Sequence, residues 1–406
     1  MKRLHYLAFC ILLIGGAVMA QPSSKGQPQV FLLDAKFLVE TKQRIQKGDK
    51  GFDAALAKLD QDAKKTLTTS DFTVTSKTTP PPSGDKRDYY SQAPYWWADP
   101  AKPDGLPYIR RDGERNPEIE KYPDHRLLNE MADAVRTLAL AYYFKGDERY
   151  ADKAVKLLRT WFLDAETRMN PNLRYAQFIP GINDGRGIGL IETRGLAELV
   201  DSVGLLAGAK SWNAADQKKL EAWFDQFLTW MRESQNGRDE AGSQNNHGTY
   251  YDLQIASFAL FVGKQELAKQ ILQSTRQTRI PKQFEPDGRQ PLELERTRSW
   301  SYSVMNLEGW VSLALLGDRA GVDLWSYKTA DGRGIRKAIE YLAPFGLDGQ
   351  TWPHKQIIPL SVKDFHRILR WAAAGYRDEK FRAMAAKLPK LALADRDNLL
   401  FPPATN

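Results

Sequence analysis

The dominant pattern along the chain is helical, with apolar residues returning every three or four positions. In residues 127–144, Leu128, Met131, Val135 and Leu138 fall on one face of a helix. Few runs alternate with the two-residue period of a strand. The same spacing predicts further helices over residues 36–67 (with a break at Gly48 and Gly51), 151–162, 188–206, 213–231 (with Asn213 as N-cap), 250–262, 266–275, 300–315, 335–342, 364–374 and 381–388.

Helices of this length joined by short loops favour an all-α fold built from antiparallel hairpins. Two architectures fit that description, a superhelical solenoid and a toroid of paired helices around a cleft. The chain shows no fixed repeat period, which disfavours the solenoid. The predicted fold class is therefore all-α, an incomplete (α/α) toroid of helical hairpins around a cleft or tunnel.

Two segments interrupt the helical pattern. Residues 68–88 are rich in Ser, Thr, Pro and Lys and are expected to form an extended surface segment. Residues 89–122 are aromatic and rich in proline, with no clear period. We expect them to form a long ordered loop, a kind of loop that is often functional.

The first 20 residues have the pattern of a cleavable secretory signal. Lys2 and Arg3 precede an apolar run, and Val18-Met19-Ala20 offers a cleavage site before Gln21. A membrane anchor is the alternative, but the apolar run is short of the roughly 20 residues that a spanning helix needs. The sequence thus predicts a signal peptide at 1–20, a linker at 21–28, one domain at 29–406, and an exported protein that is periplasmic or secreted.

Composition narrows the classes of protein further. The chain has 406 residues, 42% hydrophobic and 27% charged, which is typical of a globular protein and excludes disorder. Its single cysteine, Cys10, lies in the predicted signal, so the mature chain is expected to lack disulfides and thiolate chemistry. The formal net charge of +8 is spread along the chain, whereas nucleic-acid binding usually shows a dense basic patch. An acidic polysaccharide is the favoured partner.

The densest polar cluster occupies residues 239–252, between two predicted helices. It contains Asn245, Asn246 and His247 in succession. Polar side chains at a helix N-terminus lie near its free backbone N–H groups, where an anion is favoured. A structural interpretation also fits, with Asn245 or Asn246 as a helix cap and His247 as a packed histidine. The residues alone leave both interpretations open.

Two further segments hold candidate chemistry. If the chain is helical from residue 298 onward, Arg298, Tyr302 and Asn306 share one face, and Arg296 lies on the approach. Residues 170–189 combine asparagines, glycines and Arg186, without the Gly-Lys-Ser/Thr sequence of a phosphate loop. Both segments fit polysaccharide contact. They also fit ordinary roles, as solvated arginines or as a tight connection between helices.

Several catalytic classes are excluded by motif. The chain has five histidines, and none lies in an HExxH or similar metal-binding spacing. The GxSxG nucleophile elbow of serine esterases is also missing from the sequence. Metal-dependent hydrolysis and serine esterase chemistry are therefore not expected, and the sequence predicts no metal or other cofactor.

The run Asn245-Asn246-His247-Gly248-Thr249-Tyr250-Tyr251-Asp252, with a downstream Arg and Tyr, resembles the alginate lyase superfamily of helical-toroid polysaccharide lyases. The aromatic loop from Tyr95-Trp96-Trp97 onward and Tyr175-Ala176-Gln177 extend the similarity, which spans roughly residues 89–353. Family 5 alginate lyases have Ser-Tyr-Trp after Asn-Asn-His. The Gly-Thr-Tyr-Tyr of this chain is more similar to polysaccharide lyase family 38, which includes alginate and glucuronan lyases.

This resemblance implies β-elimination on a polyuronate, with alginate as the expected substrate. Such a lyase removes the C5 proton, which is α to the carboxylate, and expels the 4-O-glycoside. Asn246 and Arg296 are the implied neutralisers of that carboxylate, with Arg298 as the alternative arginine. His247 and Tyr302 match the family's acid–base pair. The nearby arginines are expected to favour the Tyr302 phenolate.

The stereochemistry of the sugar leaves two routes open. In mannuronate the C5 proton and the leaving oxygen share a face, so Tyr302 alone would serve as base and then acid. In guluronate, and by the same expectation in glucuronate, they lie on opposite faces, so His247 would be the base and Tyr302 the acid. Glu240 matches a family position that orients His247 or a donor. The further implied sugar-binding residues are Asn245, Arg298, Tyr175, Gln177, Arg186, Trp97, Trp300 and Tyr251.

Other functions remain as alternatives. A glucuronan lyase would use the same mechanism. An inverting glycosidase on the same toroid needs two carboxylates about 6.5–9.5 Å apart, for which Glu240, Asp252 and Glu295 are candidates. A non-catalytic polysaccharide-binding protein is the third alternative.

Overall fold

The structure is a computed structural model that describes residues 27–376 and 378–401. The predicted signal sequence, Cys10 and most of the predicted linker lie outside these ranges. Within the described residues, no helix is both long enough and apolar enough to cross a membrane.

Helices dominate the described chain, and four short strands accompany them. The helices are α1 (Ala35–Gln46), α2 (Asp53–Leu67), α3 (Asp124–Lys145), α4 (Glu148–Leu158), α5 (Leu196–Leu205), α6 (Ala214–Glu233), α7 (Gln235–Gly242), α8 (Asn246–Phe261), α9 (Gln265–Thr278), α10 (Ile280–Gln283), α11 (Pro291–Leu294), α12 (Ser299–Ala320), α13 (Ile335–Gly346), α14 (Lys363–Tyr376) and α15 (Glu379–Ala386). The strands are β1 (Tyr90–Gln92), β2 (Trp96–Trp97), β3 (Ile109–Arg110) and β4 (Tyr175–Phe178).

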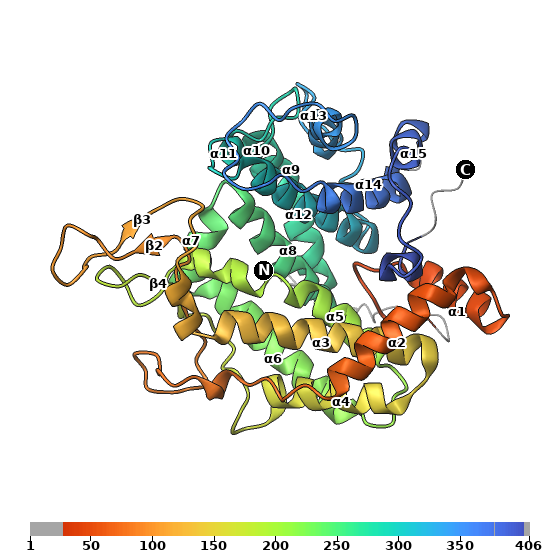
Figure 1. The fold of residues 1–406 in the computed structure, drawn as a ribbon, viewed down its shortest axis with the longest axis horizontal. Helices are drawn as coiled ribbons and strands as arrows, with labels where there is room; N and C mark the ends of the chain where they lie inside the picture. Colours follow the sequence, from red (N-terminus) through yellow and green to blue (C-terminus); the bar gives the residue numbers. More distant parts are fainter. Residues whose placement is uncertain (1–26, 377, 402–406) are drawn as a thin grey trace, which may run out of the picture.

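Neighbouring helices pair as hairpins, which confirms the predicted all-α, incomplete (α/α) toroid (Figure 1). The turn between α3 and α4 begins at Gly146, whose φ of 69° lies in the left-handed region that glycine adopts without strain. Gly263, with a φ of 77°, serves the same purpose between α8 and α9. Such tight turns fold each helix back along its predecessor.

Helix α8 is the centre of the packing. Every residue of α8 except His247 is buried, because α5, α6, α9 and α12 all pack against it. The polar side chains of this helix are buried with the rest, and Asp252, for example, is paired with Arg279. The one partly exposed side chain of α8 lies in its first turn.

Most predicted helices are present, and the differences have local causes. Gly48 separates α1 from α2 as expected, and the Asn213 side chain caps α6 by accepting from the N–H groups of Ala215 and Asp216. The helix predicted over residues 188–206 is instead a 3₁₀ helix (Gly187–Thr193) followed by α5. The sequence analysis did not predict α7, α10 or α11, which are too short to show a clear apolar period.

The predicted long loop, residues 89–122, contains three strands that sequence periodicity did not reveal. Strand β1 pairs in parallel with β4, and β2 pairs with β3 in an antiparallel ribbon. The ribbon projects from the helical body (Figure 1). Strands of two to four residues are too short to show alternation, so pairing with distant segments decides their structure.

A buried ion pair anchors the segment before this loop to the start of α3. Lys77 and Asp124 side chains, 2% and 0% exposed, lie 2.9 Å apart between Lys77 Nζ and Asp124 Oδ2. Asp124 also accepts from the backbone N–H of Tyr90 at 2.8 Å, which fixes β1 against α3. The segment at 68–88, expected on the surface, is therefore partly buried through Lys77.

Replacing Lys77 by alanine should lower the free energy of unfolding by about 3–5 kcal/mol, because Asp124 is left buried without its cation. Urea denaturation monitored by circular dichroism measures this change. The control is Lys36→Ala, which breaks an ion pair with Glu40 between side chains that are 81% and 55% exposed. It should cost less than about 1 kcal/mol. Equal effects for the two variants would contradict the structural role given to Lys77.

Candidate active site

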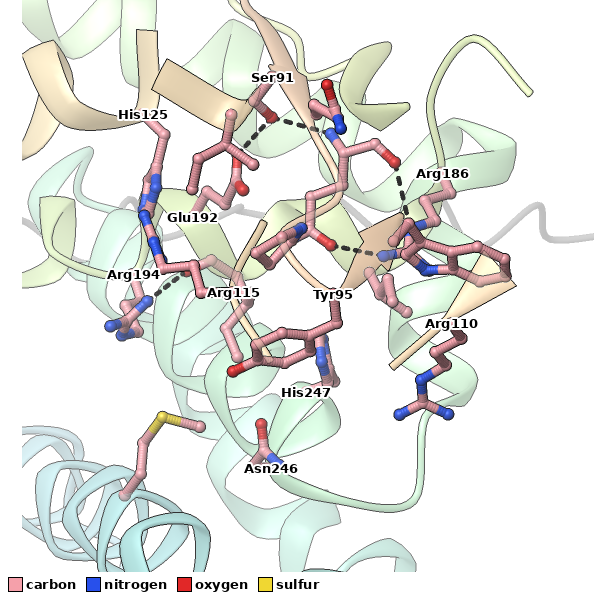
Figure 2. Close-up of a pocket in the computed structure, with 18 of the residues that line it drawn as sticks. Ser91, Tyr95, Arg110, Arg115, His125, Arg186, Glu192, Arg194, Asn246 and His247 are labelled. Carbon is pink, nitrogen blue, oxygen red and sulfur yellow. Dashed lines mark hydrogen bonds between the residues drawn. The ribbon is translucent and has the colours of Figure 1, made fainter. Parts of the chain in front are cut away.

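A cavity of about 470 Å³ opens where α3, α8 and α12 begin. His125, His247 and Tyr302 reach it from these three helices, and Tyr95 and Trp96 reach it from the loop around β2. Figure 2 shows the side chains converging on the space between Tyr95, Asn246 and His247. Helix N-termini carry partial positive charge, so their convergence favours an anionic ligand.

His247 is held by a buried carboxylate. Its Nδ1 lies 2.9 Å from Glu240 Oε1, and the Glu240 side chain is 0% exposed at the end of α7. An ionised carboxylate only accepts, so the bond places the proton on Nδ1 and leaves the Nε2 lone pair free. This is the tautomer that a general base requires.

The loop between α7 and α8 is fixed by a buried arginine. Arg279 pairs with Asp252 at 2.8 Å and donates to the carbonyl oxygens of Ala241 and Ser243. A Cβ at Gly248 would lie 2.2 Å from the Ser243 oxygen, so only glycine fits there. These contacts fix the positions of Glu240 and His247 relative to each other.

Asn246 is fully buried and clamped by Glu293 of α11. Glu293 Oε1 accepts from the Asn246 backbone N–H at 2.6 Å, and Oε2 accepts from Asn246 Nδ2 at 2.7 Å. The Asn246 Oδ1 atom has no hydrogen-bond partner. Burial raises the pKa of Glu293, and its bonds to Asn246 and the charge of Arg296 oppose that shift.

Arg296 lies between a carboxylate and the candidate catalytic tyrosine. It makes a two-pronged pair with Asp112, at 3.1 Å from Nε and 2.7 Å from Nη2, and its guanidinium lies 3.8 Å from the Tyr302 ring centroid. Its placement at the cavity agrees with the predicted approach to Tyr302. Although burial opposes the shift, Arg296 and Thr297 keep the pKa of Asp112 well below its usual range.

Tyr302 keeps its proton in this environment. Burial raises its pKa well above the usual value, and the hydrogen bond of 2.8 Å to the Tyr95 hydroxyl acts in the same direction. The positive charge of Arg296 lowers the pKa by less. Arg296 therefore acts in the direction expected from the sequence, toward the phenolate, but desolvation outweighs it and the net pKa of Tyr302 is raised.

Arg186 is a cavity arginine held by neutral groups. Its Nε and Nη2 donate to the backbone and side-chain oxygens of Gln177, at 3.2 and 2.9 Å, and its guanidinium lies 5.9 Å from the Trp96 ring centroid. Burial lowers the pKa of Arg186 to about 10. Gln177 has a φ of 50°, a strained conformation for this residue that often marks a functional site.

Of the predicted site residues, seven line the cavity and an eighth, Glu240, holds one of them. The lining residues are His247, Tyr302, Asn246, Arg296, Asn245, Gln177 and Arg186. Glu240 lies behind His247. Asn245 also caps α8, because its side chain accepts from the His247 backbone N–H at 3.2 Å. It therefore has the predicted structural role of a helix cap and also lines the cavity.

The other predicted sugar contacts lie away from the cavity lining. Trp300 is 1% exposed and packs in the core, where its Nε1 donates to the Ser361 carbonyl. Tyr251 is buried and donates to the Met231 carbonyl, because it follows the inward face of α8. Both have packing roles.

Trp97, Tyr175 and Arg298 are also absent from the lining. Trp97 points to the opposite side of the ribbon from Trp96 and donates to the Glu114 carbonyl, since successive strand residues face opposite sides. Tyr175 is buried in β4. Arg298 precedes the first turn of α12 and forms an isolated β-bridge with Gln356. Of the two arginines considered as the carboxylate neutraliser, Arg296 is therefore the one that lines the cavity.

Of the three carboxylates considered for a glycosidase, two form ion pairs and the third lies away from the cavity. Glu240 pairs with His247 and Asp252 with Arg279. Glu295 is exposed and does not line the cavity. This arrangement gives no support to an inverting pair.

Sequence reasoning missed several residues at the site. Tyr95, Asp112 and Glu293 each contact a predicted catalytic residue but come from segments distant in sequence. The signals for Tyr95 were the aromatic character of residues 89–122 and the family resemblance of the loop that begins at this residue. Arg115, His125 and Arg194 also line the cavity. Across residues 27–376 and 378–401, no group of three or more His, Cys, Asp or Glu is placed to hold a metal ion.

Comparisons with known proteins identify the family of this chain and relatives with the same fold. The alginate lyase family model matches residues 73–352. A crystal structure of an alginate lyase from Bacteroides ovatus is 38% identical, with a TM-score of 0.89 over 93% of this chain and 100% of that one. Alginate lyase A1-III from Sphingomonas species A1 has a TM-score of 0.58 at 16% identity, over 95% and 99% of the two chains. A histidine-to-alanine variant of A1-III, complexed with a tetrasaccharide, matches equally well in TM-score. No curated protein sequence matches significantly.

The toroid and its basic, histidine- and tyrosine-bearing cavity define a polysaccharide lyase. The chain belongs to the alginate lyase family, which confirms the resemblance seen in the sequence.

Replacing Glu240 by glutamine should lower kcat by about 10²- to 10⁴-fold, because the amide no longer enforces the Nδ1–H tautomer of His247. The initial rate of polysaccharide cleavage measures this effect. The matched control is Asp239→Asn, an exposed neighbour whose loss should leave the rate unchanged. Full activity in the Glu240→Gln protein would contradict the role given to this pair.

Proposed function

We propose that this protein cleaves alginate by β-elimination and yields unsaturated oligouronates. The observation that carries the proposal is the pairing of a base and an acid in one basic cavity. His247 has its Nε2 free because Glu240 occupies Nδ1, and Tyr302 keeps its proton. A base for C5 and an acid for the leaving oxygen are the two groups that elimination requires.

Arg296 and Asn246 would neutralise the uronate carboxylate. Without this neutralisation the C5 proton is too weakly acidic, since its removal creates a second negative charge on the carboxylate. Arg296 uses Nε and Nη2 for Asp112, which leaves Nη1 for the substrate. Arg186, whose hydrogen bonds go to the neutral oxygens of Gln177, would bind the carboxylate of a neighbouring sugar.

The protonated state of Tyr302 favours the two-residue route, in which His247 removes the C5 proton and Tyr302 donates to the leaving oxygen. This route fits guluronate, whose two groups lie on opposite faces of the sugar. On mannuronate, Tyr302 would first have to lose its proton, against the effect of burial on its pKa. Glucuronate differs from mannuronate only at C2, so its C5 proton and leaving oxygen share a face, contrary to the expectation that grouped it with guluronate. Glucuronan, the alternative substrate, would therefore meet the same requirement as mannuronate.

The substrate is an acidic polymer, and export would bring the enzyme to it. We infer export to the periplasm or beyond from the signal-like residues 1–20. The tetrasaccharide in the A1-III complex supports an oligosaccharide as the ligand of this fold.

The ultraviolet absorbance of the unsaturated product tests the reaction on polyguluronate, polymannuronate and glucuronan. We expect absorbance to rise on alginate polymers. His247→Ala should reduce the rate on polyguluronate by about 10²- to 10⁴-fold and the rate on polymannuronate by less, whereas Tyr302→Phe should abolish both. The exposed Glu295→Gln serves as a control. Saturated reducing ends without absorbance would indicate a glycosidase, and unchanged rates in both variants would overturn the assignment.

A further inference from the structure

The orientation of the Asn246 amide conflicts with the task proposed for it. Its Nδ2 donates to Glu293, and its Oδ1, buried without a partner, is the atom on the cavity side (Figure 2). A carbonyl oxygen repels a carboxylate, so this state cannot bind the uronate through Asn246. A buried polar atom without a partner is costly and requires an explanation.

Glu293 determines which way the amide points. As a carboxylate it only accepts, so Asn246 must turn Nδ2 toward it. Once protonated on Oε2, the same group donates, and the stable partner becomes Asn246 Oδ1. The amide then presents Nδ2 to the cavity. The bond of 2.6 Å from the Asn246 backbone N–H to Oε1 persists in both states.

We propose that Glu293 is a positioning residue that takes up one proton when a uronate carboxylate enters the cavity, and thereby turns the Asn246 amide toward the substrate. The proton comes from solvent, resides on Glu293 Oε2 while the sugar is bound, and returns to solvent when the product leaves. No covalent bond other than this O–H forms or breaks. The inference rests on the proposed function.

The surroundings of Glu293 support this exchange. Its side chain is 1% exposed, and burial raises its pKa. The charged and titratable groups facing it are Arg296, from the segment before α12, and His247, from α8, and both favour the ionised form. Asp112 neutralises Arg296, and Glu240 lies behind His247. An incoming carboxylate adds a like charge, which raises the proton affinity of Glu293 further.

A purely structural role is the competing explanation, because Glu293 also caps the first turn of α8. Glu293→Gln separates the two. The glutamine oxygen still accepts from the backbone N–H, and its Nε2 donates to Asn246 Oδ1 as the protonated acid would. The variant therefore keeps the cap and mimics the substrate-bound state.

Calorimetry of oligouronate binding, in buffers of different ionisation enthalpy, counts the protons. A Tyr302→Phe background prevents turnover. We expect uptake of about one proton per sugar chain in this background, at pH values where Glu293 is ionised in the free protein but protonated in the complex. Over that pH range the affinity should fall about tenfold per pH unit. Adding Glu293→Gln should abolish the uptake and the pH dependence while the affinity at low pH is kept. Adding the exposed Glu295→Gln should change nothing.

Equal proton uptake with and without Glu293→Gln, or weak binding by Glu293→Gln at every pH, would overturn the proposal. If Glu293→Gln does not fold, infrared difference spectra of the Tyr302→Phe protein decide. Binding should add a protonated carboxyl band, and its absence would refute the idea. A wild-type protein that forms unsaturated product while failing these tests would leave the proposed function intact.

Discussion

The active site depends on the way two buried carboxylates hold the first turn of α8. Glu240 binds His247 from α7, and Glu293 binds Asn246 from α11. The rest of α8 is buried among α5, α6, α9 and α12, so the helix cannot shift to accommodate a misplaced side chain. The rigid interior of the toroid thus fixes the two residues that we propose contact the substrate.

These two carboxylates place negative charge near a cavity that is proposed to bind a polyanion, and the surrounding residues offset that charge. A site for a polyanion benefits from positive charge, and Arg110, Arg115, Arg186, Arg194 and Arg296 line the cavity. Each carboxylate is buried behind a neutral or cationic residue, which keeps its charge away from the sugar. Asp112 does the same behind Arg296, and its charge holds that guanidinium beside Tyr302.

The fold was largely predictable, because long helices carry their apolar period in local sequence. The predictions failed where structure depends on distant partners. Strands β1 and β4 are short and pair across more than eighty residues, and Trp300 and Tyr251 pack inward because of how α12 and α8 sit in the toroid. Family resemblance located Asn246, His247, Arg296 and Tyr302, which the apolar pattern alone would not have distinguished from cap and surface residues.

The sequence-based predictions also missed Glu293 and Tyr95, which contact Asn246 and Tyr302. Nothing in the local sequence around Glu293 or Tyr95 links either residue to Asn246 or Tyr302, and only the folded chain brings them together. The sequence also shows the arginine that lowers the pKa of Tyr302, but not the burial that outweighs this effect.

A crystal structure of the Tyr302→Phe protein with an alginate tetrasaccharide tests the central claim most directly. We predict one uronate with its C5 about 3–3.5 Å from His247 Nε2, its carboxylate on Arg296 and Asn246, and its leaving oxygen beside the ring of residue 302. A sugar bound with its carboxylate away from Arg296 and Asn246, or with C5 out of reach of both His247 and residue 302, would contradict it.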